Sequence, residues 1–310
     1  MKKIINFFYS KILSVPNDSC IIILQGGLGN QIFQLLLGEE LKKNFKKKVY
    51  YYDLRKSFNI YHESSIEKLF NLKISYCFIK KKSFFERILF SLNFLRINKT
   101  LFLRFKFTLL PNLYIDSINK PIDLDKIIFS KSFNIFYGTW HNLINKYTNK
   151  DIFSVLRFRN DISSKESNFF KKDFIALHIR RGDYITSIKT SLFHGNLSIN
   201  YYVKSVDRLR SKFGNLPVYI FTDDISWVKQ KIKCLIPNSS VVSSKKNSPE
   251  IDFYLMSKAK YFIISNSTYS WFSAFLSIKK NKYIILPKYW FSNMKTNSNY
   301  IFKEWDYEII

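Results

Sequence analysis

One stretch of the chain joins the pattern of a buried strand to a cluster of charged side chains. Residues 174–179 are apolar apart from one histidine, and they lead directly to Arg180, Arg181, Gly182 and Asp183. This order predicts a strand inside a sheet, ending in a polar loop that carries two guanidinium groups. Because a guanidinium group matches the geometry of a phosphate or carboxylate, the stretch favours an anionic ligand such as a diphosphate. A surface turn with paired charges is the alternative that this stretch alone leaves open.

The length and charge of the chain limit the fold and the classes of partner. Its 310 residues are 46% hydrophobic, which is enough for a large core and favours two domains. The chain has 50 Lys and Arg against 23 Asp and Glu, a formal net charge of +27. Such a surface attracts nucleic acid, anionic membranes or phosphorylated substrates. The excess is largely lysine, in a chain also rich in Asn, Ile and Phe, and this bias also fits an AT-rich genome.

The cysteines and the apolar runs indicate the compartment. Cys20, Cys77 and Cys234 lie far apart and are odd in number, which indicates a reducing environment rather than a disulfide framework. No apolar run reaches the roughly 18 residues that a transmembrane helix needs. The N-terminus resembles a signal peptide only briefly, because Lys11 interrupts its apolar part and no small-residue cleavage site follows. We therefore expect a cytoplasmic protein.

Segments with strand and helix patterns alternate along the chain. The expected strands are at 20–25, 48–53, 135–140, 174–179, 217–222, 241–242, 261–265 and, as the last one, 283–287. The expected helices are at 31–41, 200–209 and 250–256, with others beginning near 227 and 266. This alternation predicts an α/β fold with a mostly parallel sheet in each half. A polar segment at 160–172 separates the halves, so we expect domains at 1–165 and 166–310.

Two further segments allow both a structural and a functional interpretation. Residues 78–110 are basic and aromatic, with eight Lys or Arg and one acid from Lys80 to Lys106. Such a segment can lie on an anionic membrane, but we favour amphipathic helices that cover a sheet. Asp123 and Asp125 have the spacing of a sugar-nucleotide metal motif. A helix start is the better interpretation, because no other acidic residue converges on them in the sequence.

Polar clusters follow three of the strands expected in the second half. They are His178, Arg180, Arg181 and Asp183; Asp223 and Asp224; and Ser265, Asn266, Ser267, Thr268 and Ser270. If these strands are parallel, the clusters share the sheet edge at which α/β proteins bind ligands. The arginines would neutralise phosphates, the Ser/Thr run at a helix N-terminus would add donors, and an aspartate would bind a base or ribose. Each cluster could instead be a helix cap, but together they favour a nucleotide-diphosphate site.

These clusters belong to a set of motifs that resembles glycosyltransferase family 11, the α-1,2-fucosyltransferases. The main motifs are residues 26–34, 178–184, 221–224 and 265–271, and further matches are 137–140, 194–202, 252–257 and 286–291. The resemblance covers the chain from about Ile21 to Phe291. It implies a GT-B-like architecture, with two Rossmann-like domains facing across a cleft. It also implies GDP-fucose as donor, held mainly by the second domain, inversion of the anomeric carbon, and neither a metal nor another cofactor.

The resemblance assigns roles to individual residues. It implies that Arg180 contacts the donor phosphates and is essential, with Arg181 in support. Asp223 or Asp224 would contact guanine. The diphosphate would be held by Ser267, Thr268, Tyr269 and Ser270, and the glycine loop of the first domain would close over the donor through Gly27, Gly29, Asn30 and Gln31. The base that deprotonates the acceptor stays open among Asp183, His178 and a residue of the first domain.

The resemblance also implies a biological setting. We expect transfer of L-fucose to a galactoside hydroxyl in O-antigen or surface-glycan synthesis, with an oligosaccharide acceptor that is lipid-linked at the inner membrane face. Residues 78–110 would suit contact with that membrane, and no nucleic acid is expected as a partner. One alternative is another GDP-sugar or another linkage. An alternative of a different class is a basic membrane- or nucleic-acid-binding protein without turnover.

Overall fold

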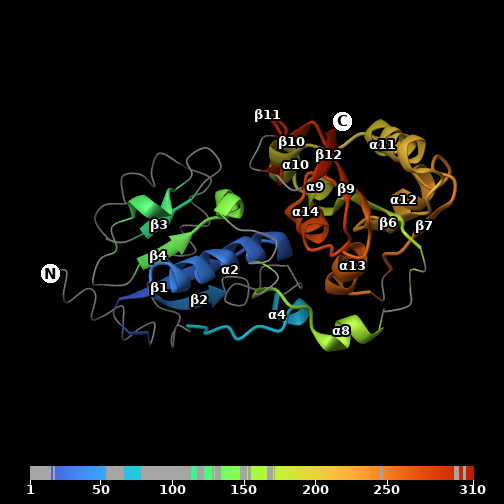
Figure 1. Cartoon of the computed structure of the whole chain (residues 1–310). Coiled ribbons are helices and arrows are strands. Elements are labelled where there is room, and N and C mark those ends of the chain that lie inside the picture. The colour runs from blue at the N-terminus through green and yellow to red at the C-terminus, as the bar shows by residue number, and fades with distance from the viewer. Residues whose placement is uncertain are drawn as a thin grey trace. The chain divides into compact units, whose positions relative to one another are not determined.

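The computed structural model divides the chain into two compact units. Unit 1 comprises Met1–Gly26, Gln31–His62 and Lys73–Leu143, and unit 2 comprises Gly27–Asn30, Glu63–Leu72 and Ile144–Ile310. The structure describes residues 15–16, 18–53, 66–77, 113–116, 122–127, 129, 134–146, 152, 155–165, 170, 172–244, 247–296, 300–302 and 305–310 (Figure 1). A division at residue 165 stays a prediction, and the contact-based units differ from it.

Unit 1 contains a four-stranded parallel sheet in the order β2-β1-β4-β3. Its strands are β1 (Ser19–Leu24), β2 (Lys48–Asp53), β3 (Leu113–Ile115) and β4 (Asn134–Tyr137). All six side chains of β1 are buried, as expected for an inner strand covered on both faces. The glycine loop that follows β1 leads into helix α2 (Leu28–Lys43), so the strand, loop and helix expected there are confirmed.

Two short 3₁₀ helices follow in the sequence, η1 (Leu124–Lys126) and η2 (His141–Lys146). The carboxylate of Asp123 accepts a hydrogen bond from the N–H of Asp125 and caps η1. The helix start expected at this position is therefore confirmed. Residues 78–110 lie outside the described part of the chain, so the two interpretations of that segment both stay open.

Unit 2 contains a six-stranded parallel sheet in the order β12-β9-β8-β5-β6-β7. Its strands are β5 (Ile175–Ile179), β6 (Val218–Thr222), β7 (Ser239–Val241), β8 (Tyr261–Ile263), β9 (Tyr283–Leu286) and β12 (Asp306–Ile309). An antiparallel pair, β10 (Tyr289–Phe291) and β11 (Met294–Lys295), lies between β9 and β12 in the sequence. The expectation that 283–287 is the last strand is therefore wrong. Strand β12 lies at the sheet edge with its side chains partly exposed, so it has no apolar run to reveal it.

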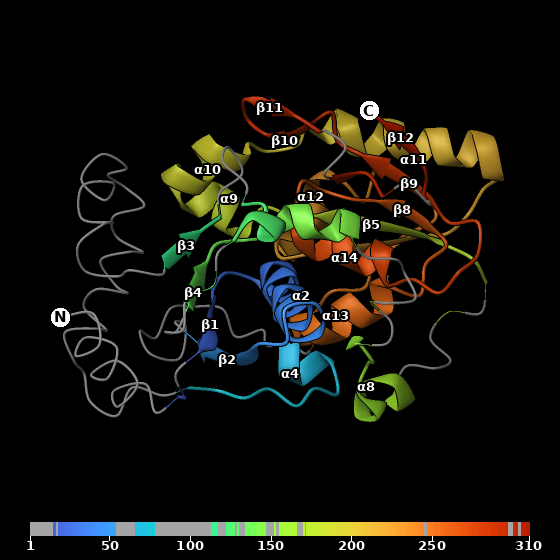
Figure 2. The same ribbon diagram turned by 60° about the vertical axis from the view of Figure 1, so that its left-hand side comes forward.

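Helices cover both faces of this sheet. The helices that lie within unit 2 are α4 (Ile66–Leu69), α8 (Asn160–Lys165), α9 (Gly182–Thr186), α10 (Ile188–His194), α11 (Ile199–Phe213), α12 (Ile225–Lys231), α13 (Pro249–Met256) and α14 (Thr268–Phe275). Helices α11 and α12 pack with Ile175, Leu177 and Ile179 of β5 in one apolar cluster. Helices α13 and α14 pack on the opposite face (Figure 2). Because β5 is covered on both sides, all five of its side chains are buried. No helix in the described ranges is both long and apolar enough to span a bilayer.

Candidate functional site

The topology of unit 2 brings the three predicted polar clusters to one sheet edge. Strand β5 lies between β6 and β8 and is parallel to both, with Ile179 paired to Thr222 and Leu177 paired to Ile263. The carboxyl ends of the three strands are therefore adjacent. This confirms the expectation that the clusters meet, and contacts between their side chains define the candidate site.

Arg180 lies between two carboxylates at the centre of this edge. Its Nη2 is 2.7 Å from Asp183 Oδ1, and its Nη1 is 2.9 Å from Asp223 Oδ2. Only 28% of the side chain is exposed. Burial disfavours the charged guanidinium group, but the charges of Asp223 and Asp183 outweigh it and raise the pKa of Arg180. Arg180 is thus a fixed, permanently charged double-pronged donor at the strand end.

Asp223 is held on both of its carboxylate oxygens. While Oδ2 pairs with Arg180, Oδ1 accepts a hydrogen bond of 2.8 Å from the backbone N–H of Arg181. A Cβ added to Gly182 would lie 2.8 Å from Asp223 Oδ2, so glycine permits this close approach. The predicted polar loop is wrong in one respect, because helix α9 begins at Gly182 directly after the arginine pair. Gly182 therefore serves packing against a carboxylate rather than a turn.

Arg181 makes a separate set of contacts. Its guanidinium group lies 3.8 Å from the centre of the Trp227 ring, and its Nε donates to Asp224 Oδ2 at 3.1 Å. The other oxygen of Asp224 accepts from the N–H of Trp227 at 3.1 Å and caps α12. These contacts join the ends of β5 and β6. Trp227 was not singled out from the sequence, although its position three residues after a capping aspartate is a signal for this contact.

His178 is buried beneath the arginine pair. Its Nδ1 lies 2.7 Å from the hydroxyl oxygen of Ser265, and its ring contacts that of Tyr269 with centroids 5.3 Å apart. Burial lowers the pKa of His178 to about 3, and the charge of Asp223 only partly opposes this effect. His178 is therefore a neutral imidazole that links β5 to the end of β8.

Acidification from pH 7 to 5 is expected to lower the free energy of unfolding through His178. The unfolded chain takes up a proton near the ordinary pKa of 6.5, whereas the folded protein does so only near pH 3. The stability that His178 contributes is thus complete above pH 6.5 and falls by about 1.4 kcal/mol for each pH unit below it. Urea unfolding across this range should show a smaller loss for His178→Gln than for the wild type. Equal losses in the two proteins would contradict this role.

The Ser/Thr run lies at the N-terminus of α14, where backbone N–H groups lack partners within the helix. The hydroxyl of Ser270 is buried and donates to the carbonyl of Ser267 at 3.2 Å, and that of Tyr269 donates to the carbonyl of Pro249. Both hydroxyl groups are therefore used within the protein. The N–H of Ser267 donates to the carbonyl of Ser265 at 2.7 Å, so the backbone N–H groups of the first turn of α14 remain as the part of the run that suits an anion.

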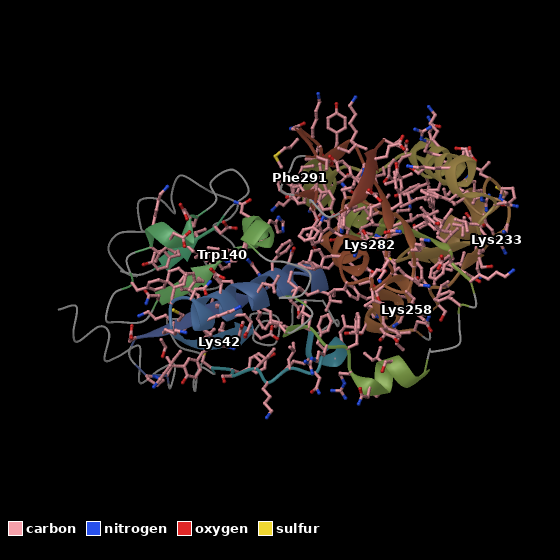
Figure 3. The ribbon with its side chains drawn as sticks, viewed as in Figure 1. Lys42, Trp140, Lys233, Lys258, Lys282 and Phe291 are labelled. Atoms are coloured by element: carbon pink, nitrogen blue, oxygen red, sulfur yellow. The ribbon has the colours of Figure 1, made fainter. Side chains whose placement is uncertain are left out.

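The other end of α14 is held by a buried lysine. The ammonium group of Lys282 donates to the carbonyl groups of Ala274, Phe275 and Ser277 at 2.9, 2.8 and 3.1 Å (Figure 3). A cation at a helix C-terminus complements the helix dipole and satisfies carbonyl groups that have no partner in the helix. This contact fixes the axis of α14 and thereby the direction in which its N-terminus points.

The four residues predicted in the glycine loop differ in their contacts. Within unit 2, Thr268 donates from its hydroxyl to Asn30 Oδ1 at 3.1 Å, and Gly29 lies against the backbone of Thr268. Gly27 has open space around its Cα. Gln31 belongs to unit 1, where its fully buried side chain donates to the carbonyl of Gly26 at 3.1 Å. Asn30 and Gly29 are therefore joined to the Ser/Thr run, while Gln31 braces the loop.

Tyr184 contacts both Arg180 and the Ser/Thr run. Its hydroxyl donates to the carbonyl of Asn266 at 3.0 Å, and its ring stacks on His194 with centroids 4.5 Å apart. Arg180 lies 5.7 Å from the centre of the same ring.

Among the described residues, no group of three or more His, Cys, Asp or Glu could hold a metal ion. That the reaction needs neither a metal nor another cofactor stays a prediction.

Known proteins with similar sequences include glycan-building enzymes. A family profile described as Glycosyl transferase family 11 matches residues 19–309. The Alpha-1,2-colitosyltransferase of Escherichia coli is 30% identical over 298 residues, which are 89% of this chain and 93% of that protein. The O-antigen biosynthesis glycosyltransferase WbnK of Escherichia coli is 41% identical over 118 residues, which are 38% of this chain and 39% of that protein.

A solved structure with a similar fold is the α-1,6-fucosyltransferase NodZ from Bradyrhizobium, soaked with GDP-fucose. The TM-score is 0.52 over 84% of this chain and 92% of that chain, at 15% sequence identity. At this identity the likeness concerns the fold alone. Together with the two parallel sheets, it confirms the GT-B-like α/β class expected from the sequence.

Proposed function

Because the chain belongs to glycosyltransferase family 11, we propose that it transfers L-fucose from GDP-fucose to a galactoside hydroxyl. The new bond would be an α-1,2 linkage, formed with inversion of the anomeric carbon. The observation that carries this proposal is the meeting of Arg180 and the start of α14 at one sheet edge. A guanidinium fork beside a helix N-terminus suits a diphosphate.

The chemical difficulty of this reaction is the charge that develops as GDP leaves. The bond from the anomeric carbon to the β-phosphate oxygen breaks, and the sugar takes on oxocarbenium character. Arg180 would stabilise the growing negative charge, aided by the N–H groups of the first turn of α14. To do so, Arg180 must exchange a carboxylate partner for phosphate. Asp183 would leave more readily than Asp223, because Asp223 is also held by the backbone of Arg181.

The same geometry favours Asp183 as the base that deprotonates the acceptor hydroxyl. His178 is buried and bonded to Ser265, and both oxygens of Asp224 are occupied by Arg181 and the α12 cap. Asp183 has 42% of its side chain exposed. Once phosphate replaces it at Arg180, its carboxylate is free to accept a proton. Donor binding would thus prepare both the leaving group and the base.

Replacing Asp183 by Asn is expected to separate these roles. Transfer to the acceptor should fall by about 10²–10⁴ in kcat, the usual contribution of a general base. Hydrolysis of the donor should change little, because Asp183 has left Arg180 in the donor complex. The affinity for GDP should not fall, because Asp183 competes with phosphate for Arg180. Asp207→Asn, at an exposed position on α11, is the matched control. If donor hydrolysis falls as far as transfer does, Asp183 positions Arg180 and is not the base.

A second candidate donor follows from the colitosyltransferase relative, which is similar over nearly its whole length. Colitose is L-fucose without the 3-hydroxyl group. A site that hydrogen-bonds that hydroxyl would reject the 3-deoxy sugar strongly, whereas a site that does not would accept both. Transfer assays with GDP-fucose and GDP-colitose against a panel of galactosides, with the linkage read by NMR, decide between the two. Failure of both donors with every galactoside would overturn the proposal.

The similarity to WbnK supports O-antigen or related surface-glycan synthesis as the setting. We propose that the chain works in the cytoplasm at the inner membrane face. The competing class is a basic binding protein without turnover. It predicts salt-sensitive binding with no preference among nucleotides. A thermal-shift comparison of GDP, UDP and ADP separates the classes, because the transferase should be stabilised by GDP alone.

A further inference from the structure

Helices α9 and α10 carry an unusual group of exposed apolar side chains. Of the nine large hydrophobic side chains that are exposed in the described part of the chain, four lie between residues 185 and 193. They are Ile185, Ile188, Leu192 and Phe193, which together we name the α9–α10 patch. Ile188 is 78% exposed and Leu192 73%. Their spacing of four places them on the same face of α10.

The packing of α10 holds this face outward. No residue of α10 is buried, and the helix is anchored mainly at its end. There the ring of Phe193 lies 4.7 Å from that of Phe291 on β10, and the N–H of Ser292 donates to the carbonyl of Phe193 at 3.0 Å. Ser187 caps the other end through the N–H of Thr190. Ile188 and Leu192 therefore take no part in the packing that holds α10 in place.

The charges around the α9–α10 patch are mostly positive, and the one acid on α9, Asp183, is paired with Arg180. Lys189 is exposed on α10, and Lys288 and Lys295 are exposed on the neighbouring β10–β11 hairpin. The sequence contains no Asp or Glu from residue 184 to 206 or from 287 to 303. The surface thus offers apolar side chains for insertion and ammonium groups for anionic headgroups, as interfacial membrane anchors do.

We propose that the α9–α10 patch docks this protein onto an anionic phospholipid bilayer. Ile188 and Leu192 enter the interface between headgroups and acyl chains, and Lys189, Lys288 and Lys295 contact the headgroups. Helix α9 begins directly after Arg180 and Arg181, so docking would place the candidate site next to the bilayer surface. The inference uses only the exposure and charge of the surface, and it stands independently of the sugar that is transferred.

Vesicle co-sedimentation of the full chain tests this surface. The wild type should bind phosphatidylcholine vesicles that contain phosphatidylglycerol, and bind pure phosphatidylcholine far less. The double variant Ile188→Ser/Leu192→Ser should bind at least about tenfold more weakly. Lys189→Glu should weaken binding about fivefold or more, and the effect should fade at high salt. Ile278→Ser is the matched control, because Ile278 is equally exposed at 75% but stands alone.

Unchanged vesicle binding of the double variant would overturn the proposal, as would an equal loss in Ile278→Ser. Sedimentation velocity of the wild type and the double variant identifies the competing occupant, a second copy of the chain. If the wild type is an oligomer, and the double variant is a monomer that still binds vesicles, the α9–α10 patch joins two copies of the chain. Thermal shift with GDP reports donor binding separately, so failure of this proposal and failure of the proposed reaction are distinguishable.

Discussion

Replacing Arg180 by Ala is expected to lower kcat for glycosyl transfer at least about a hundredfold. The guanidinium group is the one charged donor that the structure fixes at the strand end by two carboxylates. Its loss removes charge stabilisation from the leaving phosphate and also leaves Asp223 and Asp183 facing each other without a cation. The affinity for GDP should fall as well, which isothermal titration calorimetry measures alongside the rate.

Arg180→Lys should not restore transfer, because an ammonium group cannot bridge two partners as the planar fork does. Arg181→Ala is the informative companion. Arg181 braces Asp224 and Trp227, so its loss should lower stability more than it lowers kcat in the protein that remains folded. Circular dichroism confirms that each variant is folded. Near-normal turnover of folded Arg180→Ala protein would contradict the assignment of Arg180 to the phosphate site.

The sequence predicted the sheet of unit 2 well, because its inner strands are buried on both faces and therefore appear as continuous apolar runs. Each run ends where polar residues begin, and a parallel topology then leaves a single edge at which the clusters can meet. Strand β12 lacks this signature because it lies at the edge, where its side chains are partly exposed. Burial thus explains both the success and the failure.

The candidate site was less predictable than the sheet. The pattern of residues indicated charged groups at a strand end, but not that Arg180 would pair with two carboxylates. Which arginine pairs with which aspartate depends on distances across neighbouring strands, and the linear sequence does not contain them. Gly182 shows the same limit. Its place before a carboxylate suggested a turn, whereas the structure uses it to let Asp223 approach a helix.

Gly29→Ala, at the start of α2, is expected to lower both the stability of the protein and its affinity for GDP. A Cβ at this position would lie 2.5 Å from both the backbone carbon and the hydroxyl oxygen of Thr268. The backbone must move to relieve this overlap, which typically costs about 1–3 kcal/mol. The movement separates Asn30 from Thr268 and displaces the start of α14, so GDP affinity should fall at least about tenfold.

Gly27→Ala is the matched control, because a Cβ at Gly27 meets nothing within 4 Å. That variant should keep its stability and its affinity for GDP. Intrinsic helix propensity points the other way at Gly29, since alanine stabilises a helix by about 1 kcal/mol relative to glycine. If Gly29→Ala unfolds at a higher urea concentration than the wild type and binds GDP normally, propensity has prevailed and the packing against Thr268 is not tight. If it loses both stability and GDP affinity while Gly27→Ala loses neither, the contact with Thr268 is what requires glycine at position 29.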